Sequence, residues 1–514
     1  MILLQNVTIV DGTGSKPRAG DLLIDGARIA EAGPVEASGQ FETVDCTGLH
    51  VVPGFVDVHS HSDHEVIRHL PNKVLQGITT EVVGNCGISM FPTHPRHLQG
   101  NGELFGRHPE NGMNGAGEYF ESLESGGSRV NVASLLGNGT LREYVMAMRA
   151  DAATEDEMRK MERTLDQSLE GGAIGLSSGL NILPSSFASI EELIRLCGTV
   201  RKHNAYYATH MRDYKFRVLE AIDEAIAIGH GAGVPVQISH MQVVGQKNWS
   251  KLEPALERIE TARAGGLDIE IDAYPYLAGS CSIIQLLPGW CQDGGVPKLL
   301  EWLSSPTHRD RIARETDDYM SNTWDDIVIC YLKSEANQAH VGKSIARIAA
   351  ERGRPAPATV MDLLEEESGS VFIISFNNNE ANLARVLCHP LTSVITDGLV
   401  TEGLSHPRTY GTYPKFFGEY VREKKLMPLE QAVVKTSAQA ARRFRMRDRG
   451  QLQKGWFADA VVFDAASIGT ESDYRNPARD PHGIHHVLVN GQFAVRDGKL
   501  TDARAGVAVR HQGN

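Results

Sequence analysis

Residues 1–53 alternate short apolar runs with turn residues, which predicts short strands joined by hairpins. One apolar run ends at Asp25-Gly26 and another begins directly after it, and Asp-Gly between such runs is typical of a hairpin turn. Residues 441–514 have the same character, with a strand over 459–463 and a second hairpin at Asn490-Gly491. Two β-rich ends around a different middle predict one small β-sandwich built from both chain termini.

Residues 54–440 follow another pattern, in which apolar runs alternate with longer stretches of helical periodicity such as 155–170, 190–203 and 216–228. This alternation is typical of βαβ units and a parallel sheet, and eight such units close into a (β/α)8 barrel. The sequence has nine apolar runs, but a (β/α)8 barrel has only eight strands. We expect residues 371–376 to be the extra strand, outside the barrel. The runs are 54–58, 80–83, 130–136, 173–177, 205–209, 234–239, 267–272, 371–376 and 393–396.

The stretch from about residue 283 to 369 is too long for an ordinary connection between barrel elements. We expect it to form a lid or a small subdomain over the barrel mouth. The predicted fold class is therefore α/β: a TIM-type (β/α)8 barrel over residues 54–440 that carries this insertion. Residues 1–53 and 441–514 supply the two parts of the β-sandwich.

The amino-acid composition and net charge argue against several classes of protein. Of the 514 residues, 41% are apolar and 22% charged, which is typical of a soluble globular protein. The net charge of −13 disfavours binding to a phosphate backbone, so we expect no nucleic-acid partner. The chain has no apolar run long enough to span a membrane and no basic start typical of a signal peptide. Seven cysteines are a sparse, odd count that favours free thiols in a cytoplasmic protein; nothing predicts an oligomeric state.

Side chains that can bind a metal directly follow the predicted strands. Two histidines spaced i, i+2 at the end of the first strand point the same way, because side chains alternate along a strand. In a parallel barrel the carboxyl ends of all strands open on one face, so ligands from different strands can meet there. The residues expected to converge are His59, His61, Cys86, His210, His240 and Asp397.

Each of these residues has an ordinary alternative. A single histidine in an apolar strand is more often a satisfied core residue, and Cys86 alone would be a small buried apolar side chain. Asp397 would be a purely structural ligand in another interpretation. Asp63 and His64 follow the strand end and are more typical of a loop. The metal-site hypothesis rests on five separate strands that each deliver a ligand at the equivalent end.

The ligand set is rich in nitrogen, with one thiolate and one carboxylate, and this combination suits Zn²⁺ best. A catalytic zinc keeps an open position for water and lowers the pKa of that water toward about 7. Asp397 is the strand-end carboxylate placed to take a proton from such a water and to return it later. The pattern therefore predicts a zinc-dependent hydrolase.

Longer motifs surround these residues. They are Pro-Gly-Phe-Val-Asp-Val-His-Ser-His at 53–61, Gly-Asn-Cys-Gly-Ile-Ser at 84–89, Gly-Leu-Ser-Ser-Gly-Leu at 175–180, Tyr-Ala-Thr-His-Met-Arg at 207–212 and His-Pro-Arg-Thr-Tyr-Gly-Thr-Tyr-Pro at 406–414. With an aspartate after the eighth strand, the chain resembles the amidohydrolase superfamily. Over nearly its whole length it is similar to the D-aminoacylases, the N-acyl-D-amino-acid deacylases.

The resemblance implies roles for the metal-binding residues. Cys86 would stand where related amidohydrolases use a carboxylated lysine, and with His210 and His240 it would hold a tight zinc. His59 and His61 would form a second, weaker zinc site. Asp397 would be the catalytic acid and base.

The resemblance also implies a substrate, an N-acyl-D-amino acid cleaved at its amide into a carboxylate and a free D-amino acid. Arg408 would clamp the substrate carboxylate, helped by Tyr274 and Ser280. A guanidinium suits this role because it binds a carboxylate through two parallel hydrogen bonds. The ordinary alternative for Arg408 is a surface salt bridge.

Two departures from the family pattern concern the substrate side chain. Family members often carry a lysine two residues beyond the second metal-binding histidine, where this chain has Gln242. This weakens the case for an acidic side chain such as that of N-acyl-D-glutamate. Residues 181–186 keep only part of the tyrosine and proline pattern that family members often show after the Ser-Ser-Gly-Leu motif.

Two other functions compete with this hypothesis. A cyclic-amide hydrolase of the hydantoinase or dihydropyrimidinase type shares the barrel and the histidines but normally bridges two metals with a carboxylated lysine. No lysine occurs in residues 85–87 or 173–180. A non-catalytic scaffold would be expected to lose metal ligands, whereas this chain keeps all six.

Overall fold

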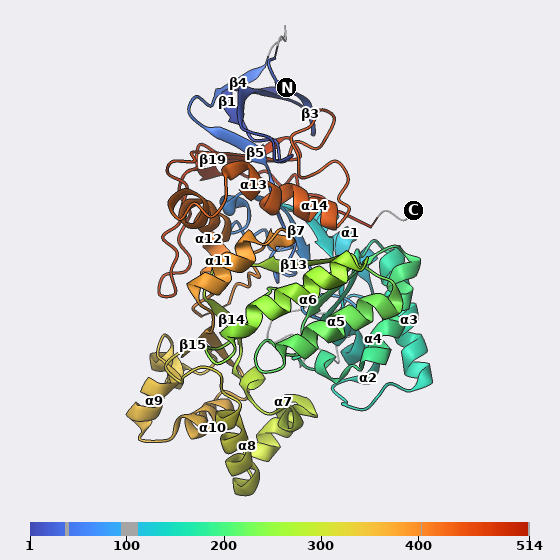
Figure 1. Cartoon of the computed structure of the whole chain (residues 1–514), viewed down its shortest axis with the longest axis vertical. Coiled ribbons are helices and arrows are strands. Elements are labelled where there is room, and N and C mark those ends of the chain that lie inside the picture. Colours follow the sequence, from blue (N-terminus) through green and yellow to red (C-terminus); the bar gives the residue numbers. More distant parts are fainter. Residues whose placement is uncertain (36–40, 94–111, 402, 512–514) are drawn as a thin grey trace.

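The computed structural model describes residues 1–35, 41–93, 112–401 and 403–511. In Figure 1 a sheet built from the chain ends lies at the top, the barrel and its helices fill the middle, and an inserted unit lies at the bottom. No described helix combines the length and the apolar character that crossing a bilayer requires. A continuous apolar core lies between the barrel strands and their helices and extends to part of the terminal sheet.

Both chain ends contribute to one nine-stranded sheet, as the β-rich termini predicted. The two expected hairpins are present, with Asp25 paired to Arg28 and Val489 paired to Gln492. Eight of the strands follow one hydrogen-bonded path and β4 pairs with β1 beside it. The division of this sheet from the barrel as a separate sandwich domain stays a prediction. The strands are β1 (Ile2–Ile9), β2 (Arg18–Asp25), β3 (Arg28–Gly33), β4 (Glu42–Asp45), β5 (His50–Pro53), β18 (Ala460–Phe463), β19 (Ile484–Val489), β20 (Gln492–Arg496) and β21 (Lys499–Leu500).

The middle of the chain forms the (β/α)8 barrel. Its strands pair in parallel and are almost entirely buried, as parallel strands covered by helices must be. The short β9 continues β8, so the nine segments fill eight positions. They are β6 (Phe55–Asp57), β7 (Ile78–Val83), β8 (Asn131–Ser134), β9 (Leu136–Gly137), β10 (Gly175–Gly179), β11 (Tyr206–His210), β12 (Val236–Ile238), β13 (Ile269–Ala273) and β17 (Thr392–Val394).

The barrel closes where the last strand, β17, meets the first, β6. The Asp397 amide donates to the His59 carbonyl at 2.9 Å, and the His61 amide donates to the Gly398 carbonyl at 3.0 Å. Beneath these bonds, Lys73 Nζ lies 2.7 Å from Asp57 Oδ2, 2.7 Å from Ser60 Oγ and 2.8 Å from Thr396 Oγ1. All three ammonium donors are thus used inside the protein, in a site where Lys73 is only 3% exposed.

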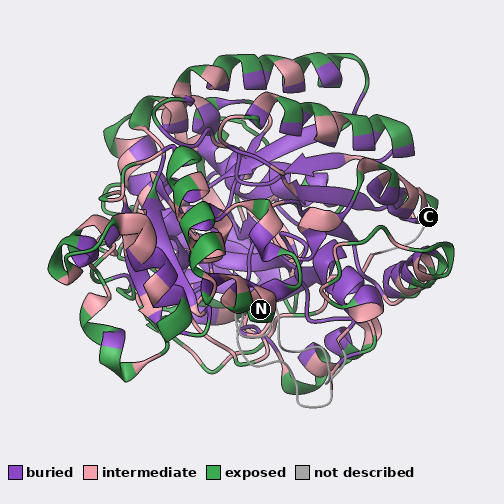
Figure 2. Ribbon diagram, turned by 90° about the horizontal axis from the view of Figure 1, so that it is seen from below, coloured by how far each residue is buried: buried purple, intermediate pink, exposed green. Residues whose placement is uncertain are grey.

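The helices cover the outside of the barrel with their polar faces outward. Figure 2 shows buried strands encircled by helices whose outer surfaces are exposed. α3 (Glu155–Glu170) illustrates the sequence logic: Thr154 and Glu157 form a capping box, and Met158, Met161 and Leu165 lie on its buried face. The others are α1 (Ala116–Gly126), α2 (Asn138–Met146), α4 (Ile190–Lys202), α5 (Val218–Ala232), α6 (Leu252–Ala264), α11 (Glu380–Cys388), α12 (Arg408–Lys415), α13 (Leu429–Val433) and α14 (Gln439–Arg443).

The inserted unit has its own three-stranded antiparallel sheet and its own apolar core. Residues 371–376 form the central strand of this sheet, which confirms that they lie outside the barrel. Pairing of Ala278 with Phe376 and of Ser282 with Phe372 brings the two ends of the insertion together at the barrel mouth. The elements are β14 (Ala278–Ser282), α7 (Gly295–Leu303), α8 (Pro306–Asp318), β15 (Ile327–Leu332), α9 (Ile345–Arg352), α10 (Ala356–Glu366) and β16 (Val371–Phe376).

Replacing Lys73 by methionine should destabilise the barrel by about 3–5 kcal/mol, because it leaves the buried Asp57 carboxylate without its cation. The free energy of unfolding from denaturant titration measures the loss. Lys454→Met is the matched control, since that lysine is 72% exposed in its ion pair with Glu31 and its removal should cost less than about 1 kcal/mol. Equal free energies of unfolding for the two variants would show that Lys73 does not stabilise the contact between β6 and β17.

Candidate metal centre and active site

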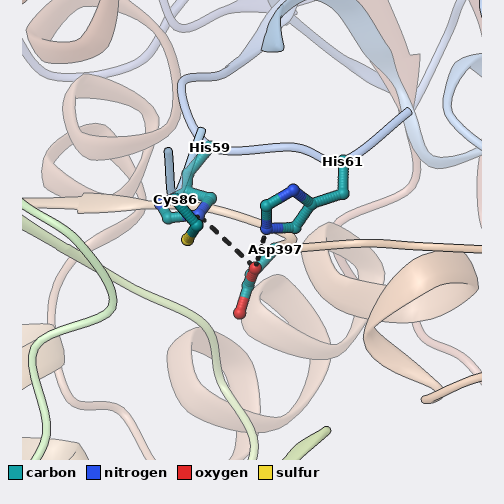
Figure 3. A group of neighbouring side chains, drawn as sticks. All are labelled: His59, His61, Cys86 and Asp397. Carbon is teal, nitrogen blue, oxygen red and sulfur yellow. Dashed lines mark hydrogen bonds and ion pairs between the residues drawn. The ribbon is translucent and has the colours of Figure 1, made fainter. Parts of the chain in front are cut away.

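The six predicted ligands lie at the carboxyl ends of the barrel strands. The two histidines of the His-Ser-His motif follow β6, and His210 is the last residue of β11. Cys86, His240 and Asp397 lie two or three residues beyond β7, β12 and β17. Figure 3 shows four of these side chains, from two histidines, the cysteine and the aspartate, pointing toward one another.

Cys86 lies at the centre of the cluster. Its Sγ is 3.3 Å from His59 Nε2, 3.6 Å from His210 Nδ1 and 3.7 Å from His240 Nε2. Ligand atoms about 2.0–2.3 Å from one tetrahedral zinc are separated from one another by roughly 3.6 Å. The thiolate and the imidazoles therefore have both the chemistry and the spacing that a zinc ion requires.

Two overlapping groups of donor atoms share this cysteine. Cys86, His210 and His240 form one group, and His59, His61, Cys86 and Asp397 form the other; within each, the donor atoms lie within 4.8 Å of one another. In the second group Asp397 Oδ1 is 3.4 Å from His59 Nε2 and 3.1 Å from His61 Nε2. The geometry thus offers two adjacent metal positions.

The backbone bends sharply at three of the ligands. Cys86, His240 and Asp397 have φ angles of 53°, 33° and 46°, in the left-handed region that residues other than glycine seldom occupy. Such strain concentrates at functional sites. Gly87 has φ of 77°, and a Cβ there would lie 2.7 Å from the Gly179 amide nitrogen, so the motif requires glycine at this position.

The surroundings of Cys86 favour its charged form. Burial by itself would raise the pKa of the thiol, but the neighbouring His59 and His61 and the hydrogen bonds to His210 and His240 hold that pKa well below its usual range. The thiolate is the form of cysteine that binds a metal. The site is therefore prepared for a cation.

Asp397 is kept ionised in the same way. Burial would raise its pKa, but the nearby Arg408 and the imidazole of His59 hold it well below its usual range. Arg408 Nη1 lies 2.9 Å from Asp397 Oδ2, and the guanidinium lies over the ring of Tyr274, with Cζ 4.6 Å from the ring centroid. The buried Nε of Arg408 has no hydrogen-bond partner among the described residues. The arginine therefore keeps a donor for an anion beside the aspartate.

A small cavity of about 90 Å³ opens beside these groups. Ser280 lines it from β14, so the inserted unit forms part of the wall. Apolar and uncharged polar side chains share the rest of the wall, and among the described lining residues Arg408 is the only arginine or lysine. The apolar residues are Ile88, Ile182, Phe372 and Leu399.

Two buried residues near the ligands had no role in the sequence prediction. Asp272 at the end of β13 accepts a hydrogen bond from the His240 amide at 2.6 Å and lies 3.5 Å from His59 Nδ1. Its place at a strand end was a usable signal. His406 lines the cavity, and its Nε2 lies 2.9 Å from the Ala278 carbonyl oxygen. Burial, and to a lesser extent the nearby charge of Arg408, holds the pKa of His406 well below its usual range. The imidazole of His406 is therefore neutral.

The sequence over residues 42–282 and 334–495 matches the amidohydrolase family. The chain belongs to this family. D-Aminoacylase from Alcaligenes xylosoxydans xylosoxydans is 34% identical over 507 residues, which cover 98% of this chain and 96% of that relative. N-Acyl-D-glutamate deacylase from the same organism is 34% identical over 493 residues, covering 95% of this chain and 92% of the relative.

Solved structures of amidohydrolases share the architecture. N-Acyl-D-glutamate deacylase from Bordetella bronchiseptica, complexed with zinc and a phosphonate mimic of the tetrahedral intermediate, is 31% identical with a TM-score of 0.86, and 99% of each chain is covered. L-Hydantoinase from Arthrobacter aurescens is 16% identical with a TM-score of 0.59, again over 99% of each chain, and this likeness shows the fold alone. The likeness to N-acyl-D-glutamate deacylase thus extends over nearly the whole chain.

Asp272→Asn should lower the affinity for zinc by about 10- to 100-fold, because groups that orient ligating histidines tune metal binding. Competition with a chelator of known affinity, with metal content read by mass spectrometry, measures the change. Asp268→Asn is the control, since Asp268 precedes β13 and pairs with Arg443 at the other end of the barrel. An unchanged zinc affinity in Asp272→Asn would remove this residue from the site.

Proposed function

We propose that this protein is a zinc-dependent hydrolase that cleaves the amide of N-acyl-D-amino acids into a carboxylate and a free D-amino acid. The observation that carries the proposal is the group of Cys86, His210 and His240 at zinc-ligand spacing, with Asp397 and Arg408 paired beside it. The relatives named D-aminoacylase and N-acyl-D-glutamate deacylase support the substrate class and the D configuration.

The first donor group would hold a tight zinc, with Cys86, His210 and His240 as protein ligands. His59 and His61 would hold a second, weaker zinc together with Asp397. When bound, zinc supplies a Lewis acid for the acyl carbonyl and lowers the pKa of a water to near neutrality. With three protein ligands, the tight site would keep a position open for water or substrate, as catalytic zinc sites do.

Asp397 is the general base and then the general acid. Its carboxylate is ionised at neutral pH, so it can accept a proton from the attacking water. The protonated carboxyl then gives this proton to the departing amine nitrogen, which leaves as the free amino group. The backbone bond from the Asp397 amide to the His59 carbonyl fixes the carboxylate beside the imidazoles.

Arg408 binds the carboxylate of the substrate. Its Nη1 already contacts Asp397, while its Nε is a buried donor with no partner among the described residues. Tyr274 lies under the guanidinium and restricts its orientation, and Ser280 adds a hydroxyl to the lining of the same cavity. Holding the carboxylate in this way positions the scissile amide for attack.

Cyclic-amide hydrolysis of the hydantoinase type remains the second candidate. Cys86 would take the bridging position here, because its Sγ belongs to both donor groups. Lys73 is the lysine near the contact between β6 and β17, and its ammonium is fully engaged by Asp57, Ser60 and Thr396. Turnover of a hydantoin, with none of N-acetyl-D-methionine, would reverse the ranking.

Asp397→Asn should lower kcat on N-acetyl-D-methionine by at least about 1000-fold, because the amide cannot accept the water proton. The tight zinc should stay bound, since its three ligands are untouched. Release of the free amine measures turnover, and metal analysis of the same sample measures zinc. Near-normal turnover with zinc bound would exclude the mechanism.

N-Acetyl-D-methionine should be hydrolysed with a kcat/KM at least about tenfold above that of N-acetyl-D-glutamate. The apolar wall offers no second cation for an acidic side chain, and burying an unpaired carboxylate is costly. Gln242→Lys supplies the missing charge and should raise kcat/KM for the glutamate substrate. Equal values for both substrates in the unchanged protein would contradict this specificity.

A further inference from the structure

A second cavity, of about 1100 Å³, lies at the other end of the barrel from the candidate metal centre. Ile174 and Asn204 line it, and these residues directly precede β10 and β11, whereas the metal-binding residues follow strand ends. Residues 444–449, after α14, and residues 507–511 complete the wall. In Figure 1, α14 and the C-terminal segment lie side by side between the terminal sheet and the barrel.

The charge of this cavity is opposite to that of the whole protein. Five arginines line it, together with the two carboxylates Glu124 and Asp448. Each carboxylate is already paired, Glu124 with Arg510 at 3.0 Å and Asp448 with Arg28 at 2.9 Å. Arg449 is paired with Asp459. Among the described residues, two of the other three guanidinium groups have no acidic partner and the third makes only an ion pair of 4.0 Å, in a chain whose net charge is −13.

These three groups belong to Arg442, Arg445 and Arg447. The nearest carboxylate to Arg442 is Glu270, at 4.0 Å. Arg445 donates to the Asn204 carbonyl, and its Cζ lies 5.2 Å from the Tyr206 ring centroid, but it has no acidic partner among the described residues. Arg447 has neither an ion pair nor a hydrogen bond within the described ranges and is exposed. Each guanidinium therefore has donors free for a ligand.

We propose that this cavity is a binding site for a small molecule that carries a polyphosphate chain. Guanidinium groups bind phosphate through paired hydrogen bonds. Several guanidinium groups along one wall can therefore pair with successive phosphates of one chain. The side chains of Phe444 and Trp456 supply apolar surface in the same cavity for an organic group. Its volume of about 1100 Å³ is slightly above the range of about 300–1,000 Å³ that is usual for small-molecule sites.

Isothermal titration calorimetry at 0.15 M salt tests the proposal, with ADP and inorganic tripolyphosphate as separate probes. We expect saturable binding of one molecule per chain. The double variant R445Q/R447Q should weaken that binding by at least about tenfold, because two charge-assisted contacts are lost. Hydrolase activity should not change in this variant, since the cavity lies at the opposite end of the strands. Tighter binding of ADP than of tripolyphosphate would support the contribution of the organic group, and equal binding would assign recognition to the phosphates.

The control is R159Q/R347Q, which removes the same charge from exposed helix positions elsewhere. Its binding should equal that of the unchanged protein. The single variant R447Q provides a second measurement, because Arg447 contacts nothing whose loss would disturb folding. Absence of saturable binding by both probes, or equal loss in both double variants, would overturn the proposal. Absence of hydrolase activity in the unchanged protein, with phosphate binding intact, would instead contradict the proposed function alone.

Discussion

Closure of the barrel at one buried lysine is the constraint on which the site depends. Lys73 joins Asp57 of the first strand to Thr396 beside the last. Directly above this contact, the Asp397 amide bonds to the His59 carbonyl. Residues separated by more than three hundred positions in sequence thereby meet at fixed spacing. A buried ion pair contributes little net free energy of folding. It does, however, destabilise any alternative alignment of the strands in which the two charged partners are separated.

The site combines features that would each destabilise an ordinary core. Imidazoles, a thiolate and a carboxylate are buried together, and three of these residues have left-handed backbone conformations. The positive charge of Arg408 attracts the negative charge of Asp397, and the neighbouring histidines favour the thiolate of Cys86. These interactions offset part of the free-energy cost of burying the charged groups. A bound cation would reduce the remaining free-energy cost of burying these charged groups. Folding stability and metal affinity are thus expected to be linked in this protein.

Much of the fold could be predicted from the sequence because each element carries a local signal. The helix over residues 155–170 has a capping box and an apolar face, and the Asp-Gly and Asn-Gly turns mark their hairpins. The placement of residues 371–376 outside the barrel followed from counting strands. Parallel topology then brings the predicted ligands to one face, so their convergence needs no detailed side-chain information.

Other features depend on contacts that periodicity does not encode. The sharing of Cys86 between two donor groups and the pairing of Arg408 with Asp397 arise from three-dimensional spacing. The position of Asp272 near a strand end is visible in the sequence, but its contact with the His240 backbone forms only after neighbouring strands align. The arginine-lined cavity is formed by chain segments from both ends and the middle, so no single stretch reveals it.

The origin of Ser280 in the inserted unit has a consequence for how this enzyme family can diversify. The candidate metal ligands and the carboxylate proposed to transfer protons lie at the ends of barrel strands, whereas part of the cavity wall belongs to a unit with a separate apolar core. Amino-acid changes within that unit can reshape the wall without moving any ligand. New substrate preferences can therefore evolve while the reaction chemistry is inherited intact.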